Sequence, residues 1–304
     1  MSASGNGHKS AIHLFHPPRR VVSLVPSLTE SMFDLGFGEY VVGITDYCVH
    51  PAEHLTNLPR VGGTKTPHLG DILALKPDLV LVNQEENPKE VIEKLEAEKI
   101  PVWVTFPKTV RQALDVLWTL VGIYQSRSAA ARLETLEMTL EWEETSQKDE
   151  THTWRYFCPI WQHIPEVNFK GDEPAWWMTF NNDTYMSDLL RFMGGENVFA
   201  GRKRLYPLEA DLGMAKEEDP EGRDTRYPCV RREEVLRVNP ELILLPDEPF
   251  AYNETHLELF SEVFSDTEAA RRKQIWLVEG DLIMWQGTRL AKALHELPAM
   301  FANL

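Results

Sequence analysis

The chain contains little that would support a nucleic-acid partner, a disulfide framework or a membrane span. Its 304 residues carry 31 basic and 47 acidic side chains. The resulting net charge of −16 repels phosphate and anionic lipid. Cys48, Cys158 and Cys229 lie far apart, without the spacing of a disulfide framework or a zinc site. Because no run of 18 apolar residues occurs, we expect no membrane insertion.

The first residues lack the apolar segment of a signal peptide. Taken literally, this absence predicts a cytoplasmic protein. We expect residues 1–18 to form a disordered tail.

The common catalytic motifs are also missing. The segment 62–66 contains Gly-Gly-Thr-Lys-Thr but not the order of a phosphate-binding P-loop. Neither G-x-S-x-G nor HExxH occurs, and His50, His68 and His163 are far apart. No nucleophile can be paired with a base. We therefore predict a protein that is not an enzyme, with no catalytic residues, no catalytic cofactor and no metal site.

An internal repeat is the most informative feature of the sequence. Residues 70–86 align without gaps with residues 233–249, at an offset of 163. In each copy a short helix stops before a proline, Pro77 or Pro240, and an apolar run follows. A run without polar alternation is typical of a strand buried on both faces of a parallel sheet.

A second repeat supports the first. Residues 32–39 align with residues 189–196 at an offset of 157, and in each copy glycines end a helix and a short strand is expected next. We expect that helix to be residues 27–35 in the first copy, capped by Ser27, with the strands at 41–45 and 198–199. Two repeats in the same order predict two lobes of one architecture.

Strands and helices alternate in both halves, which predicts α/β lobes with mainly parallel sheets. We expect an N-terminal lobe over residues 19–125 and a C-terminal lobe over residues 149–304. Residues 126–148 have leucine and alanine at helical spacing and contain no glycine or proline. This segment predicts a long, rigid helix that connects the lobes.

Long loops are expected over residues 159–182 and 201–228. Trp161, Trp176 and Trp177 fall in the first of these, and Trp285 precedes the last helix. Ligands of open α/β sheets bind at the loops that follow the strands. Loop tryptophans there suit a large, flat ligand, although they could instead cap the core of their own lobe.

Several segments together resemble a known family. They are residues 20–30, 42–47, 73–80 and 194–199. They are similar to the class III, helical-backbone solute-binding proteins of ABC importers, and the vitamin B12-binding members resemble the chain most. The resemblance implies a periplasmic or extracytoplasmic monomer that holds a small molecule in a cleft between two lobes.

The resemblance also implies which residues contact the ligand. They are Ser27, Asp46, Tyr47, Cys48, Lys65, His68, Gln84, Glu85, Trp161, Trp176, Trp177, Phe180, Asp281 and Trp285. Asp281 aligns with an acidic residue that contacts the corrin amides in the family, whereas Trp285 stands where the family has a polar side chain. Family members dock on their permease through a glutamate on each lobe. Glu233 falls on the second of these, and Gly70 with its neighbour Asp71 falls on the first.

We expect the ligand to be cobalamin or another corrinoid. Relatives with this fold bind ferric siderophores, haem or metal chelates, and these remain alternatives. A third possibility is a cytoplasmic corrinoid-handling protein. The expected binding loops offer aromatic, histidine and acidic side chains rather than arginines, which favours a neutral or cationic, amide-rich ligand.

Overall fold

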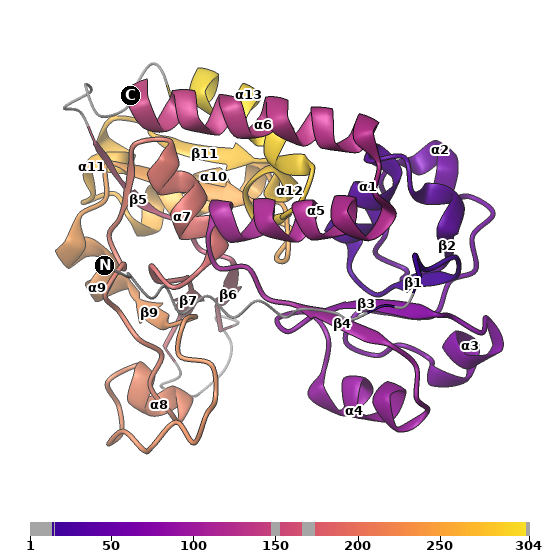
Figure 1. Ribbon diagram of the computed structural model, residues 1–304. Helices are drawn as coiled ribbons and strands as arrows, with labels where there is room; N and C mark the ends of the chain where they lie inside the picture. The colour runs from indigo at the N-terminus through magenta and orange to yellow at the C-terminus, as the bar shows by residue number, and fades with distance from the viewer. Residues whose placement is uncertain (1–13, 15, 147–152, 166–173, 302–304) are drawn as a thin grey trace, which may run out of the picture. The chain divides into compact units, whose positions relative to one another are not determined.

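The computed structural model describes residue 14 and residues 16–146, 153–165 and 174–301. The chain divides into two compact units (Figure 1). Unit 1 comprises the chain up to Pro107 together with Arg111–Met138 and Gln286–Leu290. Unit 2 comprises Lys108–Val110, Thr139–Trp285 and the chain from Ala291 onward.

Unit 1 is built on a four-stranded sheet in the order β2-β1-β3-β4, with every pair parallel. Its elements are β1 (Val21–Ser23), α1 (Pro26–Asp34), η1 (Gly38–Tyr40), β2 (Val41–Ile44), α2 (Ala52–Leu55), α3 (Leu69–Ala74), β3 (Leu79–Asn83), α4 (Lys89–Ala97), β4 (Val102–Thr105) and most of α5 (Val110–Tyr124). All five residues of β3 are buried, as expected for a central strand covered on both faces.

The two faces of this sheet are covered by different helices. Val80 and Val82 of β3 pack with Ile72 of α3 and Leu95 of α4 in one hydrophobic cluster. Helices α4 and α5 lie on opposite sides of β3 and β4 in Figure 1. The sheet is therefore the middle layer of the unit. Because helices cover both of its faces, the connecting loops lie at the ends of its strands.

Unit 2 contains two sheets. Its elements are the second part of α6 (Arg127–Ser146), then β5 (Trp154–Phe157), β6 (Trp161–His163), β7 (Trp176–Met178), α7 (Tyr185–Phe192), β8 (Gly195–Asn197), α8 (Leu208–Asp211), β9 (Cys229–Arg231), α9 (Arg232–Val238), β10 (Leu242–Pro246), α10 (Glu254–Val263), α11 (Glu268–Arg271), β11 (Ile275–Val278), α12 (Gly280–Met284) and α13 (Arg289–Phe301). The parallel sheet has the order β11-β10-β5-β8, and a smaller antiparallel sheet has the order β6-β7-β9.

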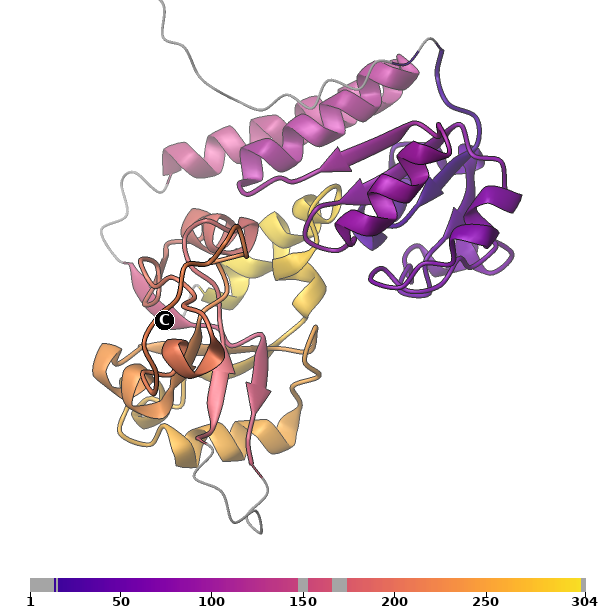
Figure 2. The same ribbon diagram turned by 90° about the horizontal axis from the view of Figure 1, so that it is seen from below.

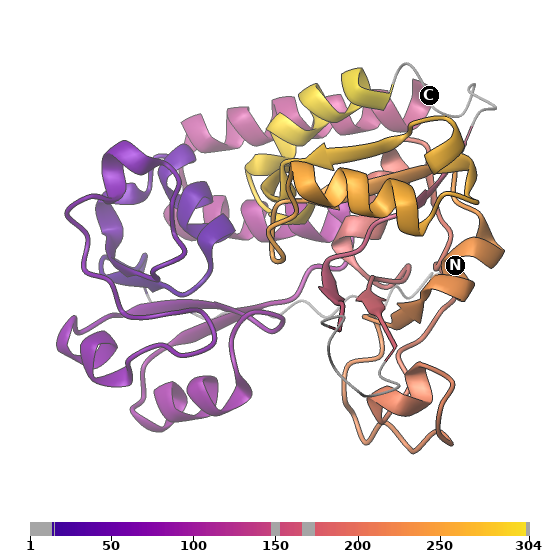
Figure 3. The same ribbon diagram turned by 180° about the vertical axis from the view of Figure 1, so that it is seen from behind.

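Two helices cover opposite faces of the parallel sheet of unit 2. Ile275 of β11 packs in the hydrophobic cluster that contains Phe260 of α10. The neighbouring Trp276 stacks on Phe301 of α13, with ring centroids 6.2 Å apart. Because adjacent residues of a strand point to opposite faces, α10 and α13 lie on opposite sides. Figure 3 shows α10 running along β10 and β11.

The internal repeat is reproduced in the backbone. Strand β3 and strand β10 begin and end at residues that differ by the predicted offset of 163. Lys76 and Asn239, also 163 apart, both adopt the left-handed conformation, with φ of 49° and 48°. Each residue directly precedes the proline of its copy and marks the end of the helix. The two parallel sheets share one strand order, so the predicted pair of similar α/β lobes is confirmed.

Three local expectations were wrong. Helix α1 begins at Pro26, with Val25 as the N-cap residue and no side-chain cap, so Ser27 is not the cap. Proline is favoured at the first helical position because its missing N–H would have no helical partner there. Strand β8 lies at Gly195–Asn197, just before the expected residues 198–199. Residues 159–182 are not one continuous loop, because they contain β6 and β7 (Figure 2).

Residues 286–290 belong to unit 1 although the segments on either side of them belong to unit 2. The guanidinium of Arg289 donates two hydrogen bonds to the Glu30 carboxylate, at 3.0 and 2.5 Å. Gln286 bonds to Asn83 and to the Pro107 carbonyl. Both Glu30 and Arg289 are nearly fully buried, and burial raises the pKa of Glu30 against the opposing effect of Arg289. These contacts explain why this short segment is part of unit 1.

The predicted domain bounds placed residues 286–290 in the C-terminal lobe and residues 108–110 in the N-terminal lobe. The compact units assign both segments the other way. Helix α6 spans Arg127–Ser146, and the division between the units falls within it, after Met138. The end of the predicted helix at 147–148 and most of the predicted N-terminal tail lie outside the described residues. In the described part of the chain, no helix combines the length and the apolar character needed to cross a membrane.

Candidate functional site

The candidate ligand-binding residues gather where parallel strands end. In a parallel sheet the carboxyl ends of the strands share one edge, and the loops that follow them form the usual ligand-binding face. In unit 1 these loops follow β2 and β3, and in unit 2 they follow β5 and β11.

In unit 1, the loop after β2 presents Asp46 and Tyr47. Asp46 is exposed, and 62% of the surface of Tyr47 is accessible. The guanidinium of Arg60 fixes the backbone of this loop. Its Nη1 donates to the carbonyl oxygens of Thr45, at 2.7 Å, and Cys48, at 2.9 Å. The loop therefore offers a phenol ring and a carboxylate on an ordered backbone.

A second loop of unit 1 lies beside the first. The Asp46 N–H donates to the carbonyl of Gly62, and a Cβ atom on Gly63 would lie 3.3 Å from Cε2 of Tyr47. Gly62 has a φ of +89°, a conformation that glycine adopts without strain. The structure thus brings Tyr47 next to the Gly-rich segment that precedes Lys65.

The end of β3 completes this face. Gln84 is exposed and Glu85 is half-buried. The Lys65 ammonium donates to the carbonyl oxygen of Glu85, and burial lowers the pKa of Lys65 against the opposing charges of Glu86 and Glu85. Asp46, Tyr47, Lys65, Gln84 and Glu85 therefore belong to one face of unit 1.

The side-chain amide of Asn87 joins the ends of β1 and β3 to the loop that contains Thr64. Its nitrogen donates to the carbonyls of Leu24, at 3.1 Å, and Thr64, at 3.0 Å, while its oxygen accepts from the N–H of Asn83 at 2.8 Å. Asn87 is 3% exposed. A buried amide that satisfies three backbone groups fixes the relative position of the loops that it joins.

Three other candidates of unit 1 have different surroundings. Ser27 is buried in the first turn of α1. Cys48 is fully buried, and its thiol lies 3.2 Å from the hydroxyl groups of both Thr29 and Thr45. His68 is exposed and pairs with Asp71 at 3.3 Å. Ser27 and Cys48 therefore offer a ligand no surface, whereas His68 is accessible.

In unit 2, Trp161 begins β6 directly after the carboxyl end of β5. Its side chain is 45% exposed and forms a T-shaped contact with the ring of Phe250, with ring centroids 5.6 Å apart and planes at 81°. Phe250 follows β10 and also packs on Tyr252, at 4.7 Å. The Trp161 ring is thus held by a neighbouring aromatic ring and still exposes surface on which a flat ligand could pack.

The adjacent tryptophans of β7 point in opposite directions. Trp176 is half-buried and stacks on His163 of β6, with ring centroids 5.6 Å apart. Trp177 is 2% exposed and packs against Phe260 and Phe264 in the core of the unit. Phe180 is also buried, beside Tyr156. Trp161 and Trp176 therefore reach the surface, whereas Trp177 and Phe180 are core residues.

Asp281 lies in helix α12, which follows β11, and Trp285 is the residue that caps the carboxyl end of this helix. Both are half-buried. The helix approaches the loop after β10 closely, because the Gly280 N–H donates to the Asp247 carboxylate at 2.7 Å. A Cβ atom at Gly280 would lie 2.4 Å from Cγ of Glu248, so only glycine allows this approach. Asp281 is thereby set beside the acidic end of β10.

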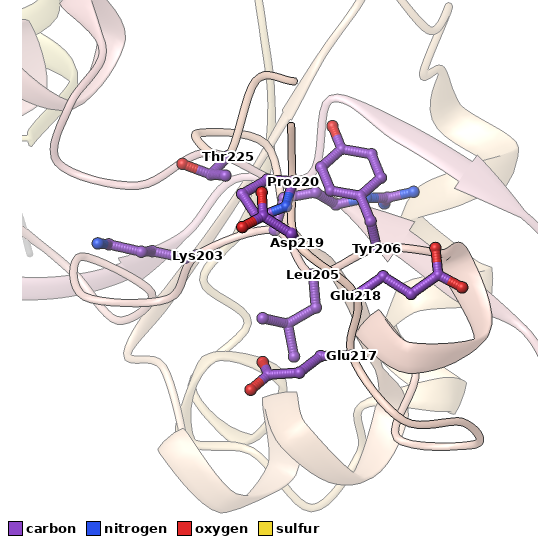
Figure 4. A pocket seen from close by; sticks show the side chains of 9 residues that line it. Lys203, Leu205, Tyr206, Glu217, Glu218, Asp219, Pro220 and Thr225 are labelled. Carbon is purple, nitrogen blue, oxygen red and sulfur yellow. The ribbon is translucent and has the colours of Figure 1, made fainter. Parts of the chain in front are cut away.

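Residues 201–228 were also expected to be one long loop but contain helix α8, and one buried carboxylate of this helix holds the segment. Asp211 pairs with Arg202 at 2.8 Å and with Arg204 at 3.1 Å, and it accepts the Cys229 N–H at 2.6 Å. The segment encloses a hollow of about 430 Å³ beside the Tyr206 ring, shown in Figure 4. Arg223 covers this ring, at 4.1 Å from its centroid. Lys203, Glu217, Glu218 and Asp219 give the hollow a mixed, solvent-exposed charge.

The titratable groups indicate binding more than chemistry. Burial raises the pKa of all three cysteine thiols, to about 11 for Cys229. A protonated, buried thiol is a poor nucleophile and a poor metal ligand. Among the described residues, no group of three or more His, Cys, Asp or Glu side chains could hold a metal ion. The faces offer stacking surfaces and hydrogen-bonding groups.

Phe250, Arg60 and Asn87 are functional candidates that the sequence interpretation missed. Phe250 and Asn87 lie 163 residues apart, directly beyond the two copies of the repeat, but their side chains differ, so the alignment gives no signal for their contacts. Arg60 has no signal either, because its contacts depend on a loop that folds back along β2.

The fold and the two faces define a two-unit α/β binding protein. Residues 21–281 match the family model described as periplasmic binding protein. This match covers most of the chain, so the protein belongs to that family.

Curated relatives of known name are similar over most of their length. The vitamin B12-binding protein of Pectobacterium atrosepticum is 26% identical over 291 residues, covering 94% of this chain and 90% of the relative. The vitamin B12-binding protein of Photorhabdus laumondii is 27% identical over 232 residues, covering 76% of this chain and 72% of the relative.

Solved structures share the fold. The periplasmic vitamin B12-binding protein BtuF of Vibrio cholerae has a TM-score of 0.71 at 20% identity, covering 93% of this chain and 96% of that one. The periplasmic haem-binding protein RhuT of Roseiflexus sp. RS-1 has a TM-score of 0.70 at 19% identity, covering 94% and 98%. These likenesses establish the class III binding-protein architecture.

Proposed function

We propose that this protein binds a corrinoid, such as cobalamin, and delivers it to an ABC-type importer without chemical change. The observation that carries the proposal is the similarity to vitamin B12-binding proteins over 94% of the chain. The family is named for periplasmic proteins, and we propose that this one also acts outside the cytoplasm, as a monomer.

The chemistry of the two faces supports a corrinoid. A corrin is a large, flat ring with amide side chains, so it needs apolar contact area and hydrogen-bonding partners. Tyr47 and Trp161 provide exposed aromatic surface. Asp46, Gln84 and Asp281 provide oxygen acceptors for amide N–H groups. Neither face requires the ligand to carry a negative charge.

Haem or a ferric siderophore is the second candidate, and the fold likeness to the haem-binding protein RhuT favours it. Haem carries carboxylates, and many siderophore complexes are anionic, so their sites benefit from free cations. Of the candidate ligand residues, Lys65 is the cation of the set, and its ammonium already bonds to the Glu85 carbonyl beside two glutamates. The acidic character of the set therefore favours a corrinoid over an anionic chelate.

Asp71 and Glu233 remain the proposed contacts to the permease. Both side chains are exposed, by 62% and 66%. They lie on α3 and α9, the helices that correspond in the two repeats. Carboxylates on equivalent helices suit arginines of a membrane partner, which would also agree with the acidic net charge of the chain.

A ligand panel tests the proposal. Purified protein would be mixed in parallel with cyanocobalamin, haem and a ferric hydroxamate siderophore, and binding would be measured by equilibrium dialysis at low and physiological salt. We expect retention of cyanocobalamin with little salt dependence, because the ligand is neutral. Retention of haem or the siderophore instead would support the second candidate and refute the corrinoid proposal.

A further inference from the structure

Arg60 clamps the loop that carries Tyr47 although it does not belong to that loop. Its Nη1 lies 2.7 Å from the Thr45 oxygen and 2.9 Å from the Cys48 oxygen, with the Asp46 oxygen at 3.3 Å. One nitrogen with two hydrogens thus satisfies the two nearer carbonyls and lies close to the third. Hydrogen bonds from a charged donor are the stronger kind.

The backbone of Arg60 is itself anchored. The Ile44 N–H donates to the Pro59 carbonyl at 3.0 Å, and the Val61 N–H donates to the Ile44 carbonyl at 2.9 Å. Arg60 therefore extends from a segment that pairs in parallel with the end of β2. The guanidinium is held from one strand-like segment and reaches across to the turn that follows the other.

The clamped turn carries Tyr47 between two buried residues. Thr45 and Cys48 are buried on either side, whereas Tyr47 is 62% exposed. The Cys48 N–H closes the turn by donating to the Thr45 carbonyl at 3.2 Å, and the Asp46 N–H is held by Gly62. Removing the guanidinium would leave these weaker bonds to define the direction in which Tyr47 and Asp46 point.

We propose that Arg60 is a positioning residue for ligand binding, which orders residues 45–48 so that Tyr47 and Asp46 meet the ligand without a loss of loop freedom. This inference rests on the proposed corrinoid-binding function. A loop ordered before binding does not have to be ordered by the ligand, and affinity rises accordingly. Arg60 acts through the backbone of the loop.

The same sheet provides a matched control in Arg20. This arginine is also exposed and also clamps backbone carbonyls, those of Leu75 at 2.6 Å and Lys76 at 3.2 Å. Its acceptors lie in the turn before β3, at the amino end of the strand. Arg20 thus makes comparable bonds at the amino ends of the strands of this sheet. Arg60 makes its bonds at the carboxyl ends, where the candidate ligand face lies.

The test compares Arg60→Met, Arg60→Lys and Arg20→Met for cyanocobalamin affinity by calorimetry, and for amide hydrogen exchange at Asp46 and Cys48. Ordering even one or two loop residues costs enough entropy that Arg60→Met should weaken binding about ten- to a hundredfold. We expect Arg60→Lys to restore part of this loss and Arg20→Met to bind like the wild type. Exchange at Asp46 and Cys48 should accelerate most in Arg60→Met, less in Arg60→Lys, and not at all in Arg20→Met.

A double-mutant cycle with Tyr47→Ala separates positioning from general stability. If Arg60 acts through the loop, Arg60→Met should have a smaller effect on affinity once Tyr47 is removed, and the remaining effect should reflect the placement of Asp46. Wild-type affinity in Arg60→Met, an equal loss in Arg20→Met, or an undiminished effect in the Tyr47→Ala background would overturn the inference. If the wild type binds no corrinoid, the proposed function fails, and unchanged exchange in Arg60→Met would show separately that Arg60 does not order the loop.

Discussion

Trp161 allows the binding face of unit 2 to be tested with a single substitution. The ring stands at the start of β6 with Phe250 against it and 45% of its surface exposed. A flat ligand that stacks on this ring would remove the remaining exposed surface from water. Trp161→Ala should therefore weaken ligand binding while leaving the fold intact, since the side chain lies outside the buried core.

The size of the effect follows from the exposed surface. A large aromatic side chain buries ~150–250 Å² when it is fully covered. With 45% exposed in the free protein, ~70–110 Å² remain for the ligand to cover. At ~25 cal/mol per Å² this burial contributes about 2–3 kcal/mol. Trp161→Ala should then raise the Kd for cyanocobalamin about 20- to 100-fold.

The assay is a calorimetric titration of each variant, with urea unfolding measured alongside. Trp142 on α6 is the matched control, because it is a tryptophan with 65% of its surface exposed and lies on no candidate loop. Trp142→Ala should bind cyanocobalamin with the wild-type Kd. An unchanged Kd in Trp161→Ala, or equal losses in both variants, would refute the assignment of Trp161 to the ligand face.

Two further predictions concern the interior. Trp177→Ala should lower the free energy of unfolding by about 3–5 kcal/mol, because it leaves a cavity in the core beside Phe260 and Phe264. Urea titrations measure this loss. A weaker affinity without a loss of stability would contradict the core placement of Trp177. The three buried thiols should not react with a disulfide reagent at pH 8 until urea is added. Because their folded pKa values are raised, stability should be retained below about pH 8.5, the unfolded pKa, and fall as the pH rises toward the value of about 11 for Cys229. Rapid labelling of the native protein, or stability that does not fall over that range, would contradict the raised pKa values.

The fold was predictable where the sequence repeats itself. Strands β3 and β10 coincide at the offset of 163 because each is a fully buried apolar run introduced by a proline. The antiparallel sheet was missed for a physical reason. Its strands β6, β7 and β9 have three residues each, and β9 pairs with β7 across about fifty residues of chain. Such pairing leaves no local periodicity to detect.

The candidate site was predictable only in part. Successive side chains of a strand point to opposite faces, so one of two adjacent tryptophans is expected to face the core. The sequence does not show which one does. The structure assigns Trp177 to the core and Trp176 to the surface. The positions of Arg60 and Asn87 could not be anticipated either, because their acceptors are backbone carbonyls whose location depends on the folded loops.

The most direct test of the account is a titration of the purified full chain with cyanocobalamin, followed by calorimetry and tryptophan fluorescence. We expect one ligand per chain, a Kd below the micromolar range and quenching of the fluorescence by the bound corrin. Absence of binding, or tight binding of haem in its place, would contradict the proposed ligand while leaving the family and the fold unchanged.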